Sequence, residues 1–283
     1  MVLFKLAEYY RPQSIAEAVE LIGRPGGGTR PLAGGTELNG RVDGSITAVV
    51  DLSGLGLDTW QHDGKTLRLG AMVTLRALAE EPELKAFARG FLAEAAVFGV
   101  PRTIRNAATI GGALAGEKGA PELLSALIAL GAHVRVHQPE PVDMTVEAFF
   151  ARKQELLPGA LISEVTIPVP AEGVGFGLSR VARTPADRAA VCVSAAARWE
   201  GDRCQWVRLG VGGLASVPMR MAAVEEALRG RTLEEWDGTV PEDVTAAAVS
   251  DVRGSAAYRR WVTPVLVRRA LEGTREGNVR DGN

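Results

Sequence analysis

The sequence predicts an α+β protein with two domains. Its 283 residues are enough for two domains of about 150 residues each. A cluster of prolines and glycines at 168–175 is typical of a linker. After this cluster, alternating strand patterns come first and helical patterns follow, which is the order of an α+β fold. We therefore expect domains over 1–168 and 174–273, followed by a polar tail over 274–283.

The first part is expected to open with a helix and short strands. A capping box, Ser14 with Glu17, precedes a helical apolar pattern that ends near Gly23. An apolar run at 47–52 is typical of a buried strand, and Asp63-Gly64 is typical of a hairpin turn between strands at 57–61 and 66–70. The other expected elements are a strand at 30–33, a short helix capped by Thr74, a helix at 83–98, a loop at 109–119, a helix at 121–130, a strand at 132–137, a helix at 144–150 and a strand at 160–167.

The second part is expected to begin with three strands, at 174–183, 189–200 and 203–213, and Gly201-Asp202 predicts a tight hairpin between the last two. Helices follow. They are expected at 220–229, after the capping box of Thr232 and Glu235, at 241–250 and at 255–272, where Tyr258, Trp261, Val262, Val265 and Leu266 recur at helical spacing.

Composition excludes several function classes. The net charge is −2 and no arginine-rich or lysine-rich run occurs, so nucleic-acid binding is not expected. No apolar run reaches the length of about 18 residues that a membrane span needs, and the first residues do not read as a signal peptide. Cys192 and Cys204 are expected to be buried thiols of a cytoplasmic protein, with a disulfide as the alternative. Neither these cysteines nor the three histidines have metal-ligand spacing, so no metal site is expected.

Two glycine-rich motifs suggest a bound anion. The first joins Gly34, Gly35 and Thr36, and the second places Thr109 before Gly111-Gly112. Consecutive glycines let backbone amides converge on one point and let a ligand approach the backbone closely. Neither motif is a P-loop or a GxGxxG fingerprint. Each could hold a diphosphate by neutral amide dipoles, or could be an ordinary turn at the end of a strand.

The order and spacing of several motifs resemble the FAD-binding medium subunit of the molybdenum hydroxylases, the carbon monoxide dehydrogenase and xanthine dehydrogenase family. The resemblance covers nearly the whole chain. It implies a two-lobed FAD-binding domain of the vanillyl-alcohol-oxidase-like type, then a C-terminal domain of antiparallel sheet and helices, with FAD extended between them. The motifs are YRPQSIAEA from Tyr10, LAGGTEL from Leu32, RNAATIGG from Arg105, LGVGGLASVPMR from Leu209 and YRRW from Tyr258.

The resemblance also implies FAD contacts, position by position. Glu122 stands where the family usually has an aspartate that bonds a ribityl or ribose hydroxyl; a solvated residue in the first turn of a helix is the alternative. Arg180 would stabilise the reduced flavin near N1–O2, or it is a charge on a strand surface. Asp187 belongs to the stretch near the isoalloxazine. The residues implied to hold the diphosphate are Leu32, Ala33, Gly34, Gly35, Thr36, Glu37 and Leu38 on one side, and Thr109, Ile110, Gly111, Gly112 and Ala113 on the other. No catalytic residue is implied.

The chain departs from the family pattern at three places. Ala113 replaces a usual asparagine, the stretch at 116–119 is unusual, and Arg188 stands where an aromatic or aliphatic residue often covers the flavin. The family resemblance implies an oxidoreductase subunit in which non-covalent FAD takes electrons from a partner and delivers them to an external acceptor. The partners would be a molybdopterin-binding large subunit and a [2Fe–2S] small subunit, which alone would hold those cofactors. The departures motivate two alternatives: a stand-alone FAD-dependent oxidoreductase acting on a small molecule, and a scaffold that has lost its flavin.

Overall fold

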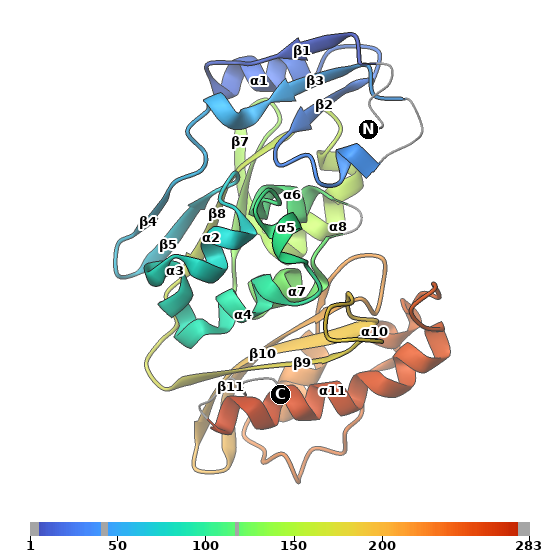
Figure 1. Ribbon diagram of the computed structural model, residues 1–283. Helices are drawn as coiled ribbons and strands as arrows, with labels where there is room; N and C mark the ends of the chain where they lie inside the picture. Colours follow the sequence, from blue (N-terminus) through green and yellow to red (C-terminus); the bar gives the residue numbers. More distant parts are fainter. Residues whose placement is uncertain (1–5, 41–44, 117–118, 277–283) are drawn as a thin grey trace. The chain divides into compact units, whose positions relative to one another are not determined.

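The computed structural model describes residues 6–40, 45–116 and 119–276 (Figure 1). Its contacts divide the chain into two compact units whose segments alternate along the sequence. The domains expected over 1–168 and 174–273 are continuous stretches of sequence. They are a different kind of division from these units and stay a prediction. Unit 1 comprises Met1–Ala77, Arg102–Gly119 and His133–Ile167, and unit 2 comprises Leu78–Pro101, Ala120–Ala132 and Pro168–Asn283.

Unit 1 contains a small parallel sheet in the order β1-β3-β2, formed by Glu8–Tyr10, Ala48–Asp51 and Thr29–Leu32. The central strand β3 is buried, as its apolar run predicts. Helix α1 (Ile15–Ile22) begins with the predicted cap, because Ser14 Oγ accepts the amide hydrogen of Glu17 at 3.2 Å. Strand β1 was not expected, since its sequence EYY is polar and mostly exposed.

A five-stranded sheet completes unit 1. Strands β4 and β5 form the predicted hairpin. The helix predicted at 144–150 is wrong at its start, because the residues at 141–145 form an edge strand, β7, before helix α8 (Val146–Leu156) begins at the Thr145 cap. Most of β7 is exposed, so its sequence lacks the apolar alternation that marks a strand. The strand order is β4 (Trp60–His62), β5 (Thr66–Gly70), β8 (Leu161–Pro168), β6 (His133–His137) and β7 (Pro141–Thr145).

Unit 2 is built on a four-stranded antiparallel sheet whose three long strands are those predicted. Two long helices cover its opposite faces: α7 (Pro121–Ala129) packs on β10 and β11, and α11 (Ala256–Glu276) packs on β9 and β10 (Figure 1). Cys192 and Cys204 in this sheet are buried free thiols, so the predicted thiol state is confirmed and the disulfide alternative is excluded. The strand order is β12 (Met219–Arg220), β11 (Arg203–Gly212), β10 (Val191–Glu200) and β9 (Val174–Val181).

Glycines in this sheet allow the helices to approach it closely. A Cβ atom added at Gly177 would lie 2.0 Å from the carbonyl oxygen of Ala270 in α11, and one at Gly210 would lie 2.2 Å from that of Ser125 in α7. Real Cβ atoms are not found at such distances. The sheet and both helices therefore meet backbone to backbone at these points, and a side chain on the glycine would force them apart.

Other predicted helices also differ in the structure. The helix expected at 83–98 is broken, because Ala88 (φ 50°) and Arg89 (φ 55°) adopt left-handed conformations ahead of Gly90. The capping box of Thr232 and Glu235 makes its reciprocal hydrogen bonds, 3.1 and 3.0 Å, but only a turn follows, because Gly238 at φ 79° redirects the chain. The helix expected at 220–229 begins only at Ala222.

The other ends and short elements are these. Helix α11 extends to Glu276, so the predicted tail starts later than 274, and 277–283 lie outside the described residues. No helix in the described part of the chain is both long and apolar enough to cross a membrane. The short helices are α2 (Leu75–Glu80), α3 (Pro82–Ala86), α4 (Phe91–Val97), α5 (Arg102–Arg105), α6 (Ile110–Ala115), α9 (Ala222–Leu228), α10 (Glu242–Ala246), and the 3-10 turns η1 (Leu38–Gly40), η2 (Leu52–Gly54) and η3 (Phe87–Gly90).

Because α11 lies so close to β9 at Gly177, we expect even the methyl side chain of alanine at this position to destabilise the fold. We expect Gly177→Ala to lower the free energy of unfolding by about 1–3 kcal/mol, the usual cost of overpacking. Gly54→Ala is the matched control, because a Cβ there meets nothing nearer than 3.4 Å. Denaturant unfolding measures both variants, and equal stability of the two would contradict the packing argument.

Candidate functional site

The first glycine motif, at 32–38, begins at the last residue of strand β2. A Cβ atom added at Gly34 would lie 1.6 Å from the carbonyl oxygen of Ala107, so only glycine allows this contact. Gly35 has φ 67°, a left-handed conformation that also favours glycine. Both glycines are thus required by the local backbone. The first of them brings the motif against the segment that leads into the second motif.

The amides of the first motif are available as donors. Within the described residues, the backbone N–H groups of Gly34, Gly35 and Thr36 make no hydrogen bond to the protein. The side chain of Thr36 is exposed. Three successive donors at a bend of the chain can bind an anion without any positive side chain, as the sequence predicts.

The second motif differs from the expected loop, because Ile110–Ala115 form helix α6 with Thr109 as its N-cap. The amides of the four residues that follow Thr109 already donate hydrogen bonds. Ile110 N–H donates to Val73 O, and Gly111 N–H donates to Ala71 O, both at 2.9 Å. The amides of the next two residues donate to the Oγ1 and O of Thr109, at 3.0 and 2.9 Å. The expectation of a row of free amides here is therefore wrong.

The two glycines of the second motif have different structural roles. A Cβ at Gly111 would lie 2.7 Å from Ala71 Cβ, so this glycine permits close packing inside unit 1. Gly112 is exposed, and a Cβ there would meet only Thr109 Oγ1, at 3.0 Å. Gly112 therefore leaves bare backbone at the surface of α6, which a ligand could approach closely. Ala113 beside it is half-buried.

A second contact joins the two motifs. A Cβ atom added at Gly116, which ends α6, would lie 2.1 Å from Glu37 Oε2, so the Glu37 carboxylate packs on this glycine. Lys153 Nζ donates to the carbonyl oxygen of Gly116 at 2.6 Å. The structure thus brings 32–38 and 109–113 close together in unit 1, an arrangement that only the family resemblance implied. Residues 117–118 of the unusual stretch lie outside the described residues.

The other three predicted site residues lie in unit 2 and form one network. Glu122 stands in the first turn of α7 and is fully buried, so the alternative of a solvated helix residue is excluded. Its Oε1 accepts hydrogen bonds from Arg180 Nε at 2.9 Å and from the Ala189 amide at 3.2 Å. The side chain of Arg180 is only 12% exposed, so the surface-charge alternative is excluded as well.

Arg180 binds protein atoms through each of its three nitrogens. Besides Glu122, the guanidinium donates to the carbonyl oxygens of Pro185, at 3.2 Å, and Asp187. It also lies over the ring of Phe98, 5.0 Å from the ring centroid. The carboxylate of Asp187 points elsewhere and pairs with Arg183 at 3.0 Å. No sequence pattern indicates that Glu122 and Arg180 are partners, because they are far apart along the chain.

The second carboxylate oxygen of Glu122 is the unusual atom of this network. Oε2 is buried and has no hydrogen-bond partner among the described residues. Burial raises the pKa of Glu122 above its ordinary value, against the opposing effect of Arg180. A buried acceptor without a donor is costly, so a hydroxyl or water that donates to Oε2 would be bound favourably.

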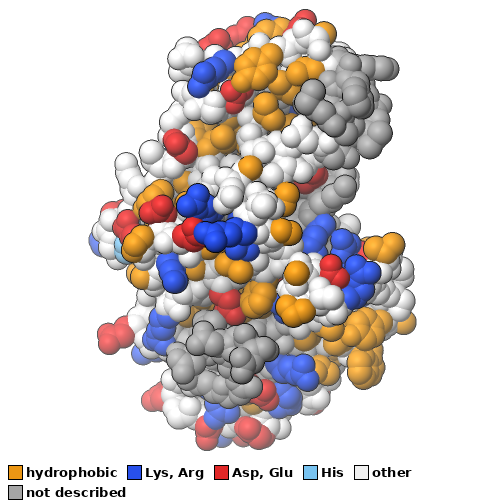
Figure 2. All heavy atoms as spheres, in the orientation of Figure 1, with side chains coloured by type: hydrophobic (Ala, Val, Ile, Leu, Met, Phe, Trp, Pro, Cys, Tyr) orange, Lys and Arg blue, Asp and Glu red, His pale blue; other side chains and the backbone are white. Residues whose placement is uncertain are grey.

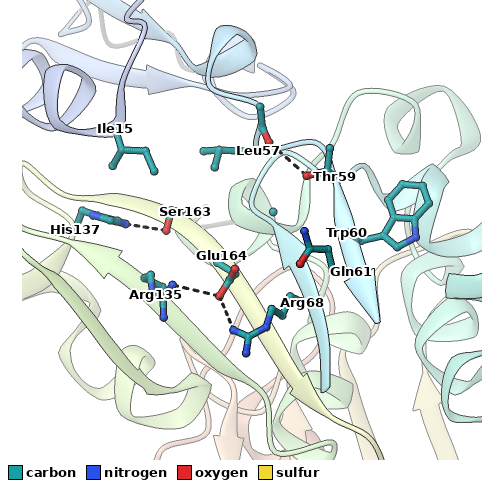
Figure 3. Close-up of a pocket in the computed structure, with 12 residues that line it drawn as sticks. Ile15, Leu57, Thr59, Trp60, Gln61, Arg68, Arg135, His137, Ser163 and Glu164 are labelled. Carbon is teal, nitrogen blue, oxygen red and sulfur yellow. Dashed lines mark hydrogen bonds and ion pairs between the residues drawn. The ribbon is translucent and has the colours of Figure 1, made fainter. Parts of the chain in front are cut away.

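Unit 1 also contains a pocket of about 280 Å³ that the sequence did not indicate (Figure 3). His137 Nε2 and Ser163 Oγ lie 2.9 Å apart, and Glu164 reaches both Arg68, at 3.7 Å, and Arg135, at 3.6 Å. On the strands these charges resemble an ordinary solvated face, which explains why sequence patterns missed them. The pocket contains no residue of either glycine motif.

The buried state of Glu122 predicts a pH-dependent stability in the protein without ligand. Because its pKa is raised in the fold, the stabilisation from the protonated carboxyl is complete below about pH 4.5 and is lost as the pH rises through the raised pKa. The stability of the wild type relative to Glu122→Gln should therefore fall as the pH rises above 4.5.

Glu155→Gln is a control with the opposite sign, because Arg152 lowers the pKa of Glu155. Its contribution should be present above pH 4.5 and lost as the pH falls. Denaturant unfolding over a pH series measures both variants. A difference in unfolding free energy between wild type and Glu122→Gln that does not change with pH would contradict a raised pKa for the buried Glu122 carboxyl.

Two protein families match consecutive parts of the chain. Residues 4–170 match the family described as "FAD binding domain in molybdopterin dehydrogenase". Residues 178–274 match the "CO dehydrogenase flavoprotein C-terminal domain". Together the two matches cover both glycine motifs and the network around Glu122 and Arg180. Residues 171–177 lie between the two matches.

Relatives of known name match over nearly their full length. The carbon monoxide dehydrogenase medium chain of Afipia carboxidovorans is 30% identical over 279 residues, covering 94% of this chain and 95% of that protein. The nicotine 6-hydroxylase medium subunit of Paenarthrobacter nicotinovorans is 28% identical, covering 93% and 95%. A solved carbon monoxide dehydrogenase structure from Hydrogenophaga pseudoflava superimposes with a TM-score of 0.86 at 27% identity, covering 96% and 98%. The chain belongs to the FAD-binding medium-subunit family of the molybdenum hydroxylases.

Proposed function

We propose that this chain performs the flavin step of a molybdenum hydroxylase. In this step, electrons from the [2Fe–2S] clusters of a small subunit reach FAD and pass to an external acceptor. A molybdopterin-binding large subunit would oxidise the substrate. On this proposal, residues 1–168 form the FAD-binding domain and 174–273 the C-terminal flavoprotein domain. The observation that carries the proposal is the row of amides at Gly34, Gly35 and Thr36 that make no hydrogen bond within the described part of the chain, at a motif of a family that binds FAD.

The first motif fits the diphosphate of FAD. A diphosphate needs several donors, and the three amides supply them without a lysine. The contact of Gly34 with Ala107 and the left-handed Gly35 hold these donors in one arrangement before any ligand binds. Donors that are already in place cost less ordering on binding. In the second motif we assign the contact to the bare backbone of Gly112, since the amides there are already bonded.

Glu122 fits a different part of the ligand. Its unpartnered Oε2 would accept a hydrogen bond from a ribityl or ribose hydroxyl of FAD, the role that the family resemblance implies for this position. Arg180 would then be a positioning residue, because it holds Oε1 of the same carboxylate. Its charge is largely offset by Glu122, so we assign it no direct part in stabilising the reduced flavin. FAD itself supplies the redox chemistry, and the protein contributes binding and orientation.

The need for partner subunits rests on composition and on the relatives. The chain has two cysteines, both buried in unit 2, and an iron–sulfur cluster needs more thiolates than these. The relatives named above are a medium chain and a medium subunit of the same length class. We propose that the chain joins such a complex in the cytoplasm, where two free thiols stay reduced.

The absorbance spectrum of the purified chain tests the proposal most simply. We expect the bands of bound flavin, FAD as the released compound, and no substrate turnover by the chain alone. Turnover without molybdenum and iron would favour a stand-alone oxidoreductase. Absence of any flavin, even after incubation with FAD, would favour a scaffold and contradict the proposal.

A charge placed at the first motif tests the diphosphate assignment. Thr36 is exposed, so Thr36→Asp should leave the fold intact while its carboxylate repels the diphosphate. We expect the Kd for FAD to rise by at least about tenfold. Thr59→Asp is the matched control, an exposed threonine of the same unit outside both motifs. Titration of apoprotein with FAD measures both, and equal affinity would refute the assignment.

A further inference from the structure

Unit 2 carries a solvent-exposed apolar patch. It consists of Val252, which is 85% exposed, and of Tyr258 (38%), Trp261 (71%) and Val265 (40%) on helix α11. The three helix residues share one face, because they are spaced three and four apart. Figure 2 shows hydrophobic side chains gathered over this part of α11, beside blue arginines. We name these four residues the α11 patch.

Helix α11 does not need this face for its own packing. Its opposite face carries Val262, Leu266 and Val267, which are buried in the core of unit 2. A helix that packs on one side is expected to be polar on the other. Exposed tryptophan is unusual on such a face, and clustered exposed aromatic residues typically mark an interaction site.

The α11 patch is held in a fixed shape. The rings of Tyr258 and Trp261 are in contact, with centroids 6.1 Å apart. The turn that carries Val252 is closed by a bridge between Asp251 and Gly254, and a Cβ at Gly254 would lie 3.3 Å from the Tyr258 ring. The buried Arg259 binds the Asp251 carboxylate from beneath. A rigid surface loses little conformational entropy on binding.

Positive charge borders the α11 patch. Arg260 and Arg269 are exposed on the same helix, and neither makes an ion pair within the described residues. Arg253, at the turn, lies 3.6 Å from the carboxylate of Asp251, its one ion-pair partner among the described residues. A partner surface complementary to this one is apolar at its centre and acidic at its rim. A second copy of this chain, meeting through the same face, would instead oppose arginines to arginines.

We propose that the α11 patch docks this chain onto another subunit of the molybdenum hydroxylase complex, through an apolar depression rimmed by carboxylates. Trp261 is the central anchor, Tyr258, Val252 and Val265 surround it, and Arg260 and Arg269 pair with the acidic rim. This inference rests on the proposed function, because that function supplies the partner subunits.

The test compares two exposed tryptophans of the purified chain, which is mixed with separately purified molybdopterin-binding and [2Fe–2S] subunits. Trp261→Glu should weaken assembly at least about tenfold, because a central aromatic anchor is lost and a charge is buried. Trp206→Glu, on β11 and 43% exposed, is the matched control and should assemble as the wild type does. Titration of the purified chain with the other two subunits, followed by light scattering after gel filtration, measures assembly.

Further variants and readouts separate the outcomes. Arg269→Glu should weaken assembly and reduce its dependence on salt. FAD content and unfolding temperature of every variant report folding, so a variant that assembles poorly but keeps FAD and stability supports the inference. Assembly of Trp261→Glu equal to that of wild type would overturn it, whereas loss of FAD by the wild-type chain would instead refute the proposed function. Self-association of the chain that Trp261→Glu abolishes, or binding of the wild type to anionic lipid vesicles in place of the subunits, would also overturn it.

Discussion

The contact between the backbones of Gly34 and Ala107 is the constraint on which the candidate site depends. It brings two motifs that are far apart in the sequence into one corner of unit 1, at a distance that no side chain allows. With Gly34 fixed and Gly35 in a left-handed conformation, the chain bends away from strand β2. Among the described residues the amides of 34–36 are therefore left without partners, while those of 110–113 hold α6 in place through bonds to Ala71, Val73 and Thr109. The first motif therefore has amides available to a ligand, and the second motif holds it in position.

In unit 2, buried charged side chains rather than backbone contacts determine the arrangement around Glu122. Burying Glu122 and Arg180 costs desolvation, and their mutual attraction offsets this cost only in part. The pair gains from the further hydrogen bonds that Arg180 gives to the turn at 185–187 and that Ala189 gives to Glu122. Oε2 is left out of this arrangement. A pair that satisfies three nitrogens and one of two oxygens is better suited to present a carboxylate oxygen than to stabilise the fold.

Sequence patterns predicted the parts of the structure that depend on neighbouring residues. The Ser14 cap, the hairpin of β4 and β5, the buried strand β3 and the long strands of unit 2 follow from local spacing. Polar edge strands and the break at Ala88 carry no such pattern, so they were missed. In the site, the residue types were anticipated but their roles depended on distant partners. Gly111 faces Ala71, and Glu122 faces Arg180, and neither pairing is visible along the chain.

Amide hydrogen exchange with and without FAD reports each backbone donor separately, so it shows whether the amides of 34–36 hold the ligand. We expect FAD to slow exchange at Gly34, Gly35 and Thr36, whose amides have no partner among the described residues. The amides of Ile110 and Gly111 are already bonded and should change little. Slowed exchange at 110–113 with no change at 34–36 would show that the first motif does not bind the diphosphate.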